Sequence, residues 1–388
     1  MHAHIQLHEW RTSAPLTLSA ASLHQLSELG HLLEIRPASE GRWTLRPHGI
    51  VGRLQLAEYT LDLRPKHPVA NLCQLISTVA EVPRLFDPTV AFDEGTLPDL
   101  LVAAFVGRAE ALVQAGLRRD YRERRERLPV LRGRLDLPAH VRRPEQLVAD
   151  LSCRHVDYTL DTPFNNVLAQ TVAACRSRWP ALAARVTRLR HRLSSLAPSD
   201  LRPADIASFR YDRLTEPYRP VHALCRLILA GTRLGLGAHD TPGASFIVEM
   251  APLFEKFVSL SLRKRLEPPW RVELQDRTSL DTGGAIEIIP DIVVYRGDRA
   301  VAVLDAKYKV RRQGAPSPDD AYQALAYARR HGLRRTWLIF PDRPAGPSVR
   351  ETHDQANELI DYGLDLGAAW SDVDAALDRL AESVRTSA

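Results

Sequence analysis

Two acidic residues and one lysine, placed near the ends of two apolar segments, carry the clearest chemical signal in the sequence. Asp291 lies within the apolar run 286–295, and Asp305 precedes Lys307 by two positions in the next apolar run. Two carboxylates held close together suit a hard divalent cation, and a neighbouring ammonium group suits the charged transition state of phosphoryl chemistry. The sequence therefore predicts a site for Mg²⁺ or Mn²⁺ with Asp291 and Asp305 as ligands.

The lysine is informative because the chain has few lysines. Of the 52 Lys and Arg residues only five are Lys, and two of these, Lys307 and Lys309, lie within five residues. A guanidinium cannot freely replace a compact ammonium at a catalytic position. The plain alternative is chance, since acidic residues occupy 47 of 388 positions. Two acids inside apolar strands favour a functional site, because a lone buried carboxylate is costly.

Two flanking helices supply further candidates. Glu255, in the first turns of a helix that follows Pro252, could complete the metal site or orient a water molecule. Gln323 and Tyr327 are four residues apart and share one face of a helix predicted over 318–331. The structural alternatives are a solvated acid near a helix N-terminus for Glu255, and a packing tyrosine with a glutamine at its polar edge.

The turn between the two strands decides whether the carboxylates share a face of the sheet. We expect strands at about 286–295, 300–308 and 335–340. A two-residue loop pairs position 291 with 304 and puts Asp305 on the opposite face, whereas a three-residue loop pairs 291 with 305. The sequence therefore predicts the loop Gly297–Arg299, or a β-bulge near Asp291.

Hydrophobic patterns divide the chain into three parts of an α/β multi-domain protein. Residues 1–95 are predicted to form a β-rich N-terminal domain with one helix at about 70–80. Residues 96–245 are mostly helical, and 246–388 read as helix, strand, strand, helix, strand, helix. The charged stretch 117–127 is predicted to be a solvated helix with Arg–Glu pairs, with a phosphate-contacting or partner-contacting edge as the alternative.

Composition excludes several classes of protein. The chain is 45% hydrophobic and 26% charged, has no apolar run long enough for a membrane span, and lacks a signal peptide at its N-terminus. We therefore expect a cytoplasmic protein. Its net charge of +5 permits nucleic-acid binding without requiring it. The four cysteines are scattered and form no Cys-x-x-Cys motif, which indicates isolated thiols.

The order Pro290-Asp291, Asp305-Ala306-Lys307 and Gln323-x-x-x-Tyr327 resembles the PD-(D/E)xK nuclease superfamily. More closely, it resembles the McrC family, the nuclease subunits of McrBC modification-dependent restriction systems. The similarity extends to further segments of the chain, namely Pro65–Val79, Gly116–Tyr121, Leu131–Leu135, Thr162–Asn166, Phe246–Glu255 and Asp305–Lys309.

The resemblance implies a DNA endonuclease that cleaves phosphodiester bonds with Mg²⁺ or Mn²⁺. Its core would be a restriction-endonuclease-like α/β domain over 246–388. The catalytic residues would be Glu255, Asp291, Asp305, Lys307, Gln323 and Tyr327, the first three of them holding the metal. The implied partners are DNA and an McrB-like AAA+ motor whose GTPase the subunit stimulates. The chain has no Gly-x-x-x-x-Gly-Lys-Ser/Thr motif, which fits a motor on a separate polypeptide.

Two other functions stay open at this stage. One is a stand-alone RecB-like or Cas4-like exonuclease, although the scattered cysteines argue against the iron–sulfur cluster of Cas4-type enzymes. The other is a non-catalytic activator of an AAA+ partner. If the chain works with an AAA+ partner, as endonuclease subunit or as activator, we expect residues from about 96 to 240 to dock on the AAA+ ring. This region carries the densest arginine and no catalytic motif.

Overall fold

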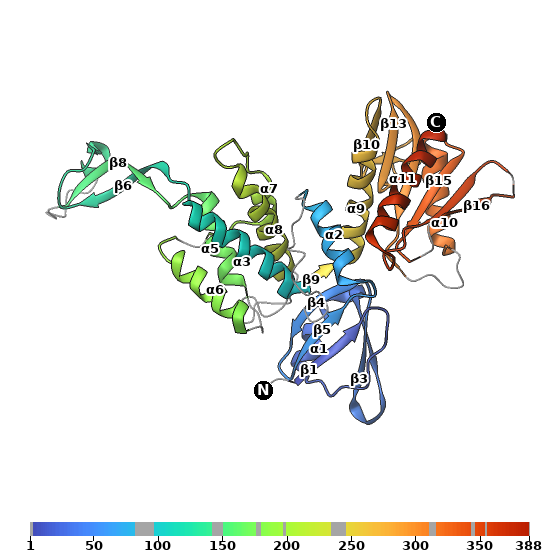
Figure 1. Cartoon of the computed structure of the whole chain (residues 1–388), viewed down its shortest axis with the longest axis horizontal. Coiled ribbons are helices and arrows are strands. Elements are labelled where there is room, and N and C mark those ends of the chain that lie inside the picture. The colour runs from blue at the N-terminus through green and yellow to red at the C-terminus, as the bar shows by residue number, and fades with distance from the viewer. Residues whose placement is uncertain are drawn as a thin grey trace. The chain divides into compact units, whose positions relative to one another are not determined.

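The computed structural model divides the chain into two compact units, Met1–Leu101 with Gly231–Ala388, and Val102–Ala230 (Figure 1). Each unit is described by itself. The residues that the structure describes are 3–81, 97–141, 150–175, 180–196, 199–233, 246–309, 316–342, 346–353 and 355–387. None of the helices in these ranges is long and apolar enough to span a membrane.

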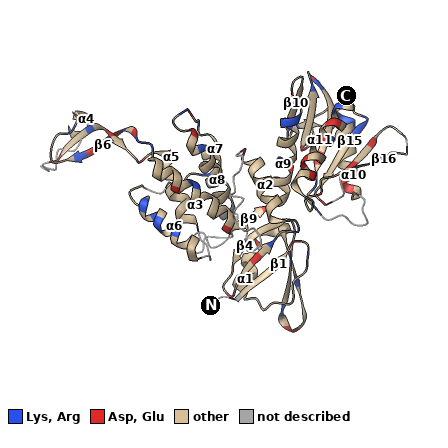
Figure 2. Cartoon of the chain, in the orientation of Figure 1, with Lys and Arg blue, Asp and Glu red and all other residues tan. Residues whose placement is uncertain are grey.

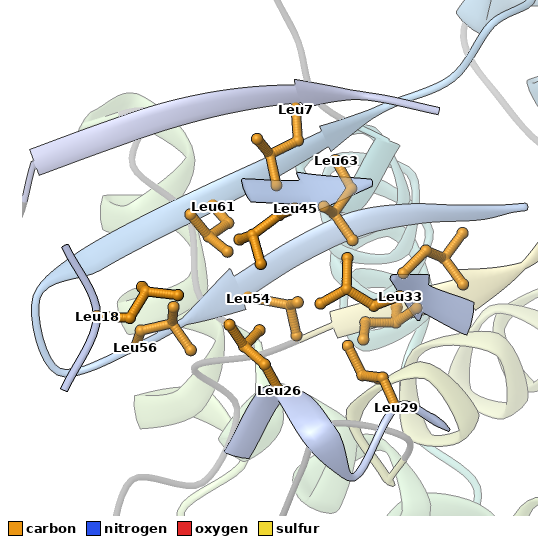
Figure 3. Close-up of a cluster of buried hydrophobic side chains, with 12 residues drawn as sticks. Leu7, Leu18, Leu26, Leu29, Leu33, Leu45, Leu54, Leu56, Leu61 and Leu63 are labelled. Atoms are coloured by element: carbon orange, nitrogen blue, oxygen red, sulfur yellow. The ribbon is translucent and has the colours of Figure 1, made fainter. Parts of the chain in front are cut away.

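The N-terminal part of the first unit is a small β domain. Its four-stranded sheet has the order β1-β5-β4-β9, in which β1 and β5 are parallel and the other pairs are antiparallel. Buried leucines fill its core, among them Leu26, Leu45 and Leu54 (Figure 3). The elements are β1 (Ala3–His8), α1 (Ala20–Ser27), η1 (Gly30–Leu32), β2 (Leu33–Pro37), η2 (Ser39–Gly41), β3 (Trp43–Pro47), β4 (Ile50–Gln55), β5 (Tyr59–Arg64), α2 (Val69–Val79) and β9 (Phe246–Glu249).

Sequence patterns predicted α2 but not α1, which has only eight residues. The last strand of the small sheet, β9, comes from the C-terminal part of the chain and pairs with β4. Since α9 (Met250–Arg265) begins directly after β9 and contacts α2, the β domain and the C-terminal domain are joined in one unit.

The C-terminal part of the first unit contains a mixed six-stranded sheet of order β10-β13-β14-β15-β17-β16. Strands β14, β15 and β17 are parallel, and the other pairs are antiparallel. The remaining elements are β10 (Trp270–Leu274), β11 (Thr278–Ser279), β12 (Glu287–Ile288), β13 (Ile292–Arg296), β14 (Arg299–Ala306), α10 (Pro318–Arg330), β15 (Arg335–Phe340), β16 (Gly346–Glu351), β17 (Glu358–Gly363) and α11 (Trp370–Thr386).

Helices α10 and α11 cover opposite faces of this sheet, as the alternating side chains of its strands show. Leu338 and Phe340 of β15 pack against α10, together with Ala324 of that helix. On the other face the Tyr362 hydroxyl donates to the Ala376 carbonyl of α11. The predicted helix over 318–331 is confirmed as α10, and Ser317 caps it by accepting from the N–H of Asp320.

The strand predicted over 286–295 is interrupted, which corrects the sequence interpretation. Residues 287–288 pair with β11 in a separate two-stranded sheet, and the main strand β13 starts only at Ile292. Pro290 has no N–H for a sheet ladder, and it lies in the break between the two strands. The sequence patterns also missed the strands β10, β16 and β17.

The second unit holds helices and a small sheet. The predicted charged helix over 117–127 is wrong, because β6 pairs with β8 in antiparallel register along nine residues. Arginine and glutamate that are close in sequence can form ion pairs along a helix or with residues of a neighbouring strand. The presence of a partner strand decides which of the two structures forms. The elements are α3 (Leu97–Ala115, in this unit from Val102), β6 (Asp120–Leu128), β7 (Arg134–Leu135), α4 (Leu137–Val141), β8 (Leu151–Thr159), α5 (Pro163–Ala174), α6 (Pro180–Arg192), α7 (Pro203–Ala207), η3 (Glu216–Tyr218) and α8 (Arg219–Arg233).

A fully buried asparagine organises the helical part of this unit. The Asn165 side chain donates to the carbonyls of Arg118 and Leu160 and accepts from the Tyr218 hydroxyl at 2.7 Å. Thr162 caps α5 by accepting from the Asn165 N–H. This network explains why the segment Thr162–Asn166 has its particular residues, which carry no catalytic signal.

A buried polar network joins the β domain to the end of β14. The Glu9 carboxylate is 3% exposed and accepts from the Tyr308 hydroxyl at 3.1 Å and from the Lys66 N–H at 2.9 Å. The Lys66 ammonium in turn pairs with Asp342. Burial raises the pKa of Glu9 to about 7. Tyr308 directly follows Lys307, so this network anchors the chain next to the candidate site.

Replacing Glu9 with Gln should remove a loss of stability at alkaline pH. Burial raises the pKa of Glu9 from 4.5 to about 7, so the stability that its protonated form contributes is complete below about pH 4.5 and is lost as the pH rises through 7. The wild type should lose up to about 3 kcal/mol relative to Glu9→Gln over this range. Urea unfolding between acidic and alkaline pH measures the difference, with the exposed Glu267→Gln as control. Parallel stability curves for wild type and Glu9→Gln would contradict the assignment.

Candidate active site

The hairpin of β13 and β14 aligns the two aspartates. Its turn has two residues, Gly297 and Asp298, so the predicted three-residue loop is wrong. The predicted alternative, a β-bulge, is present instead between Val294 and Tyr295, and it shifts the register by one residue. Beyond the bulge Ile292 pairs with Leu304, so Asp291 stands opposite Asp305 and their side chains share one face.

Asp305 is a buried carboxylate with one partner group. It lies between β13 and β15 in the sheet and is 1% exposed. Among the described residues, neither of its oxygens accepts a well-oriented hydrogen bond, but the Lys307 ammonium lies 2.7 Å from Oδ2 in an ion pair. The Asp305 charge contributes to the raised pKa of Lys307, although burial opposes it. A carboxylate this buried with spare acceptor capacity fits a cation ligand.

Asp291 lies close enough to Asp305 and Glu255 for their charges to affect its pKa. Its Oδ2 accepts from the Ala306 N–H at 2.8 Å, which ties it to the strand that carries Asp305. Burial, together with the negative charges of Asp305 and Glu255, raises the pKa of Asp291 to about 8. Concentrated negative charge of this kind is relieved by a bound cation.

Glu255 reaches the same group of charges from α9. Burial raises its pKa, the charge of Asp305 adds to this, and a hydrogen bond from Gln275 opposes it. The side-chain amide of Gln275 donates to Glu255 Oε1 at 3.1 Å. The backbone N–H of Gln275 donates to the Asp291 carbonyl at 3.0 Å. Gln275 has a φ of 50°, which is uncommon for a residue other than glycine. Sequence reasoning missed Gln275, since no motif marks this position after β10.

A chain of hydrogen bonds runs from Lys307 through α10 and back to the hairpin. The Lys307 ammonium donates to Gln323 Oε1 at 2.9 Å, and Gln323 Nε2 donates to the Tyr327 hydroxyl at 2.7 Å. That hydroxyl donates to the Ile289 carbonyl at 3.1 Å. Because an ammonium can only donate, it fixes the orientation of the Gln323 amide. The structure therefore brings Lys307, Gln323 and Tyr327 together as one network.

The arrangement offers three acidic groups and one ammonium at one end of the sheet. All six residues singled out in the sequence meet here, linked by the contacts and charges above. The three carboxylates do not bring their oxygens within 4.8 Å of one another. Among the described residues, the group of His, Cys, Asp or Glu that meets this distance consists of Glu126, His155 and Asp157.

Comparison with known proteins identifies the family. The model of the McrBC 5-methylcytosine restriction system component family matches residues 45–341, which is most of the chain. The chain belongs to this family. The McrC resemblance of the sequence is thereby confirmed.

A solved structure shows the same fold. The chain is similar to one in the refined half-complex from the tetradecameric assembly of Thermococcus gammatolerans McrB AAA+ hexamers with bound McrC, at 18% identity and a TM-score of 0.64, covering 98% of this chain and 100% of that chain. A chain of the Thermococcus gammatolerans McrBC complex matches at 18% identity and a TM-score of 0.47, over 68% of this chain and 88% of that one. No curated protein matches.

Replacing Tyr327 with Phe should destabilise the chain. The substitution removes the hydroxyl of a buried tyrosine, which accepts from Gln323 and donates to the Ile289 carbonyl, so both hydrogen bonds are lost. We expect a loss of about 1 to 2 kcal/mol in the free energy of unfolding, measured by chemical denaturation. Tyr322→Phe on the same helix is the control, since Tyr322 is 73% exposed and should change stability by less than about 0.5 kcal/mol. Equal effects of both substitutions would show that the hydroxyl network contributes nothing.

Proposed function

We propose that this McrC-family chain is the DNA endonuclease subunit of a modification-dependent restriction system. The observation that carries the proposal is the hairpin register, which brings Asp291 beside Asp305, with the Lys307 ammonium 2.7 Å from Asp305. This combination suits the hydrolysis of a phosphodiester, whose transition state gains negative charge. The activity would be hydrolytic and would depend on Mg²⁺ or Mn²⁺.

Asp291, Asp305 and Glu255 are the residues that would hold the cation. Within the described part of the chain the buried Asp305 oxygens accept no well-oriented hydrogen bond, and this and the raised pKa of Asp291 support the assignment. A bound divalent ion supplies a Lewis acid and lowers the pKa of its water. Lys307 provides positive charge beside the scissile phosphate, and Gln323 holds the Lys307 ammonium in position. Tyr327 orients Gln323 in turn.

The order of elements around the site supports a PD-(D/E)xK core. Helix α9 precedes the strands β10, β13 and β14, and α10 and β15 follow them. The motif Asp305-Ala306-Lys307 ends the last strand of this series, and Gln323 lies on the helix after it. The fold likeness to a chain in an McrB–McrC assembly adds to this support.

An McrB-like AAA+ GTPase is the partner that we infer. The similar solved assembly contains McrB AAA+ hexamers with bound McrC. We place the contact on the second unit, in which Arg, Asp and Glu lie side by side on the sheet that includes β6 (Figure 2). Tyr121, Val156 and Tyr158 on this sheet are more than half exposed. Exposed aromatic and apolar side chains among charges are typical of a protein interface.

A Cas4-like exonuclease is less well supported. All four cysteines are buried thiols outside any disulfide, at scattered positions in both units. A non-catalytic activator would have no use for three acidic groups and a lysine held together by the hydrogen bonds described above. The endonuclease is therefore the function that the geometry favours.

Asp291→Ala, Asp305→Ala and Lys307→Ala should each abolish cleavage of modified plasmid by the chain with its AAA+ partner, GTP and Mg²⁺. The first two remove proposed cation ligands, and the third removes the charge beside Asp305. Stimulation of the partner's GTPase should be unchanged, which shows that the variants fold and bind. Asp298→Ala in the exposed hairpin turn and Lys264→Ala on α9 are matched controls and should cut normally. Cleavage at the wild-type rate by Asp305→Ala would sink the proposal.

Gln323→Ala should separate positioning from metal binding. A neutral amide contributes hydrogen bonds rather than charge, so the variant should bind Mn²⁺ as the wild type does. Cleavage should be slower by about 10- to 1000-fold, or about 1.4 to 4 kcal/mol of barrier, because the Lys307 ammonium loses its acceptor. Calorimetric titration with Mn²⁺ and single-turnover cleavage measure the two effects. Loss of Mn²⁺ binding equal to that of Asp291→Ala would instead make Gln323 a ligand.

A further inference from the structure

A second group of potential metal ligands lies on the small sheet of the second unit, remote in sequence from the proposed nuclease residues. Glu126 of β6 pairs with Cys153 of β8, and Arg124 pairs with His155. Since side chains alternate along a strand, Glu126, His155 and Asp157 project from the same face of the sheet. The proposed nuclease chemistry uses none of them.

The distances between these three side chains fit a single metal ion. His155 Nε2 lies 3.1 Å from Glu126 Oε1 and 3.3 Å from Asp157 Oδ1, and the three ligand atoms lie within 4.8 Å of one another. Two ligands of a tetrahedral zinc ion, each bonded at about 2.0 to 2.1 Å, are separated by about 3.3 Å. The side chains therefore need only small shifts to enclose an ion.

The imidazole of His155 is buried without a well-oriented hydrogen bond. His155 is 5% exposed, and within the described part of the chain neither ring nitrogen has a hydrogen-bond partner. Buried polar groups nearly always have one, because leaving them without a partner costs free energy. The Nε2 atom lies within 3.3 Å of an oxygen of each carboxylate, so a cation bound by all three side chains would give the imidazole a partner.

Gly133 lies against the backbone and Cβ of His155. It has a φ of 71°, and a Cβ added there would lie 2.5 Å from the Arg154 carbonyl and 2.7 Å from the Cβ of His155. Only glycine permits this approach of the chain to the His155 backbone. The segment that contains Gly133 therefore packs directly on β8 at the base of the His155 side chain.

Two arginines hold the aspartate. Arg132 Nη2 donates to Asp157 Oδ1 at 2.6 Å, and Arg124 Nε lies 3.2 Å from Asp157 Oδ2. A carboxylate oxygen has two lone pairs, so Oδ1 can accept from Arg132 and still bind an ion. Hydrogen-bonded partners around a ligand orient it for its metal.

We propose that Glu126, His155 and Asp157 bind a zinc ion that clips β6 to β8. An imidazole ligand favours zinc over magnesium or calcium, which prefer oxygen ligands only. Three protein ligands leave one position for water. The ion would link two strands that are distant in sequence, and would stabilise the sheet on which we place the partner contact. The site stands on its own ligands and does not depend on the nuclease assignment.

Zinc titration of the full chain tests the site. The parent protein is Asp291→Ala/Asp305→Ala, so that zinc at the proposed nuclease site does not contribute. Calorimetry with ZnCl₂ should find one ion per chain, and zinc should raise the melting temperature. His155→Ala and Glu126→Gln in this parent should each weaken binding at least about tenfold, or about 1.4 kcal/mol. His140→Ala is the matched control, because His140 is exposed in the same unit and should leave the affinity unchanged.

The outcomes are distinct. Glu126 is partly exposed, so Glu126→Gln should fold even if His155→Ala does not. Zinc binding that is unaffected by Glu126→Gln would place the ion elsewhere and overturn the proposal. Absence of stoichiometric zinc binding in the parent would also overturn it, and would leave His155 as an ion-pair partner of the two carboxylates.

Discussion

The candidate site depends on one constraint, which is that Asp305 is buried in the sheet opposite a second acid. A carboxylate 1% exposed is costly unless positive charge compensates it. The surrounding elements supply part of that compensation. Lys307 pairs with Asp305, α10 provides the acceptor for the Lys307 ammonium through Gln323, and the Ala306 N–H donates to Asp291. The charge that is left unbalanced is what we propose a divalent cation neutralises.

The elements around this site are locked together by polar contacts on both faces of the sheet. On the α10 face, Tyr327 ties Gln323 to the Ile289 carbonyl in the break before β13. On the other face, Tyr308 is held by Glu9 from the N-terminal β domain, and Lys66 pairs with Asp342. The N-terminal domain thus shares in positioning the segment around Lys307. This gives the β domain a structural part in the site although it contributes no candidate catalytic residue.

The two units present different chemistry. The first unit collects acidic groups and an ammonium at one end of a sheet, which suits phosphodiester hydrolysis. The second unit carries arginines, carboxylates and exposed aromatic side chains on a small sheet, which suits a protein partner. The function that we propose needs both kinds of surface, and they belong to different compact units of the chain.

Sequence patterns were sufficient for the parts of the structure that rest on local rules. The helix capped by Ser317, the strand over 335–340 and the shared helical face of Gln323 and Tyr327 follow from spacing and capping alone. The motif residues Asp291, Asp305 and Lys307 were found because their types and order are unusual in apolar strands. The structure places them together, while their catalytic role stays a prediction.

Only the tertiary structure decided what depends on distant partners. Residues 120–128 form a strand because β8 pairs with them, although the charges of this stretch would suit a helix equally well. The bulge that aligns Asp291 with Asp305 became visible only in the pairing of the two strands, where the register shifts between Val294 and Tyr295. Gln275 contacts Glu255 of the candidate site, and Glu9 contacts Tyr308 next to it. Both contacts join residues that are separated in sequence. Local sequence determines which residues favour a helix, a strand or a site, but pairing across long sequence separations determines their register and their neighbours.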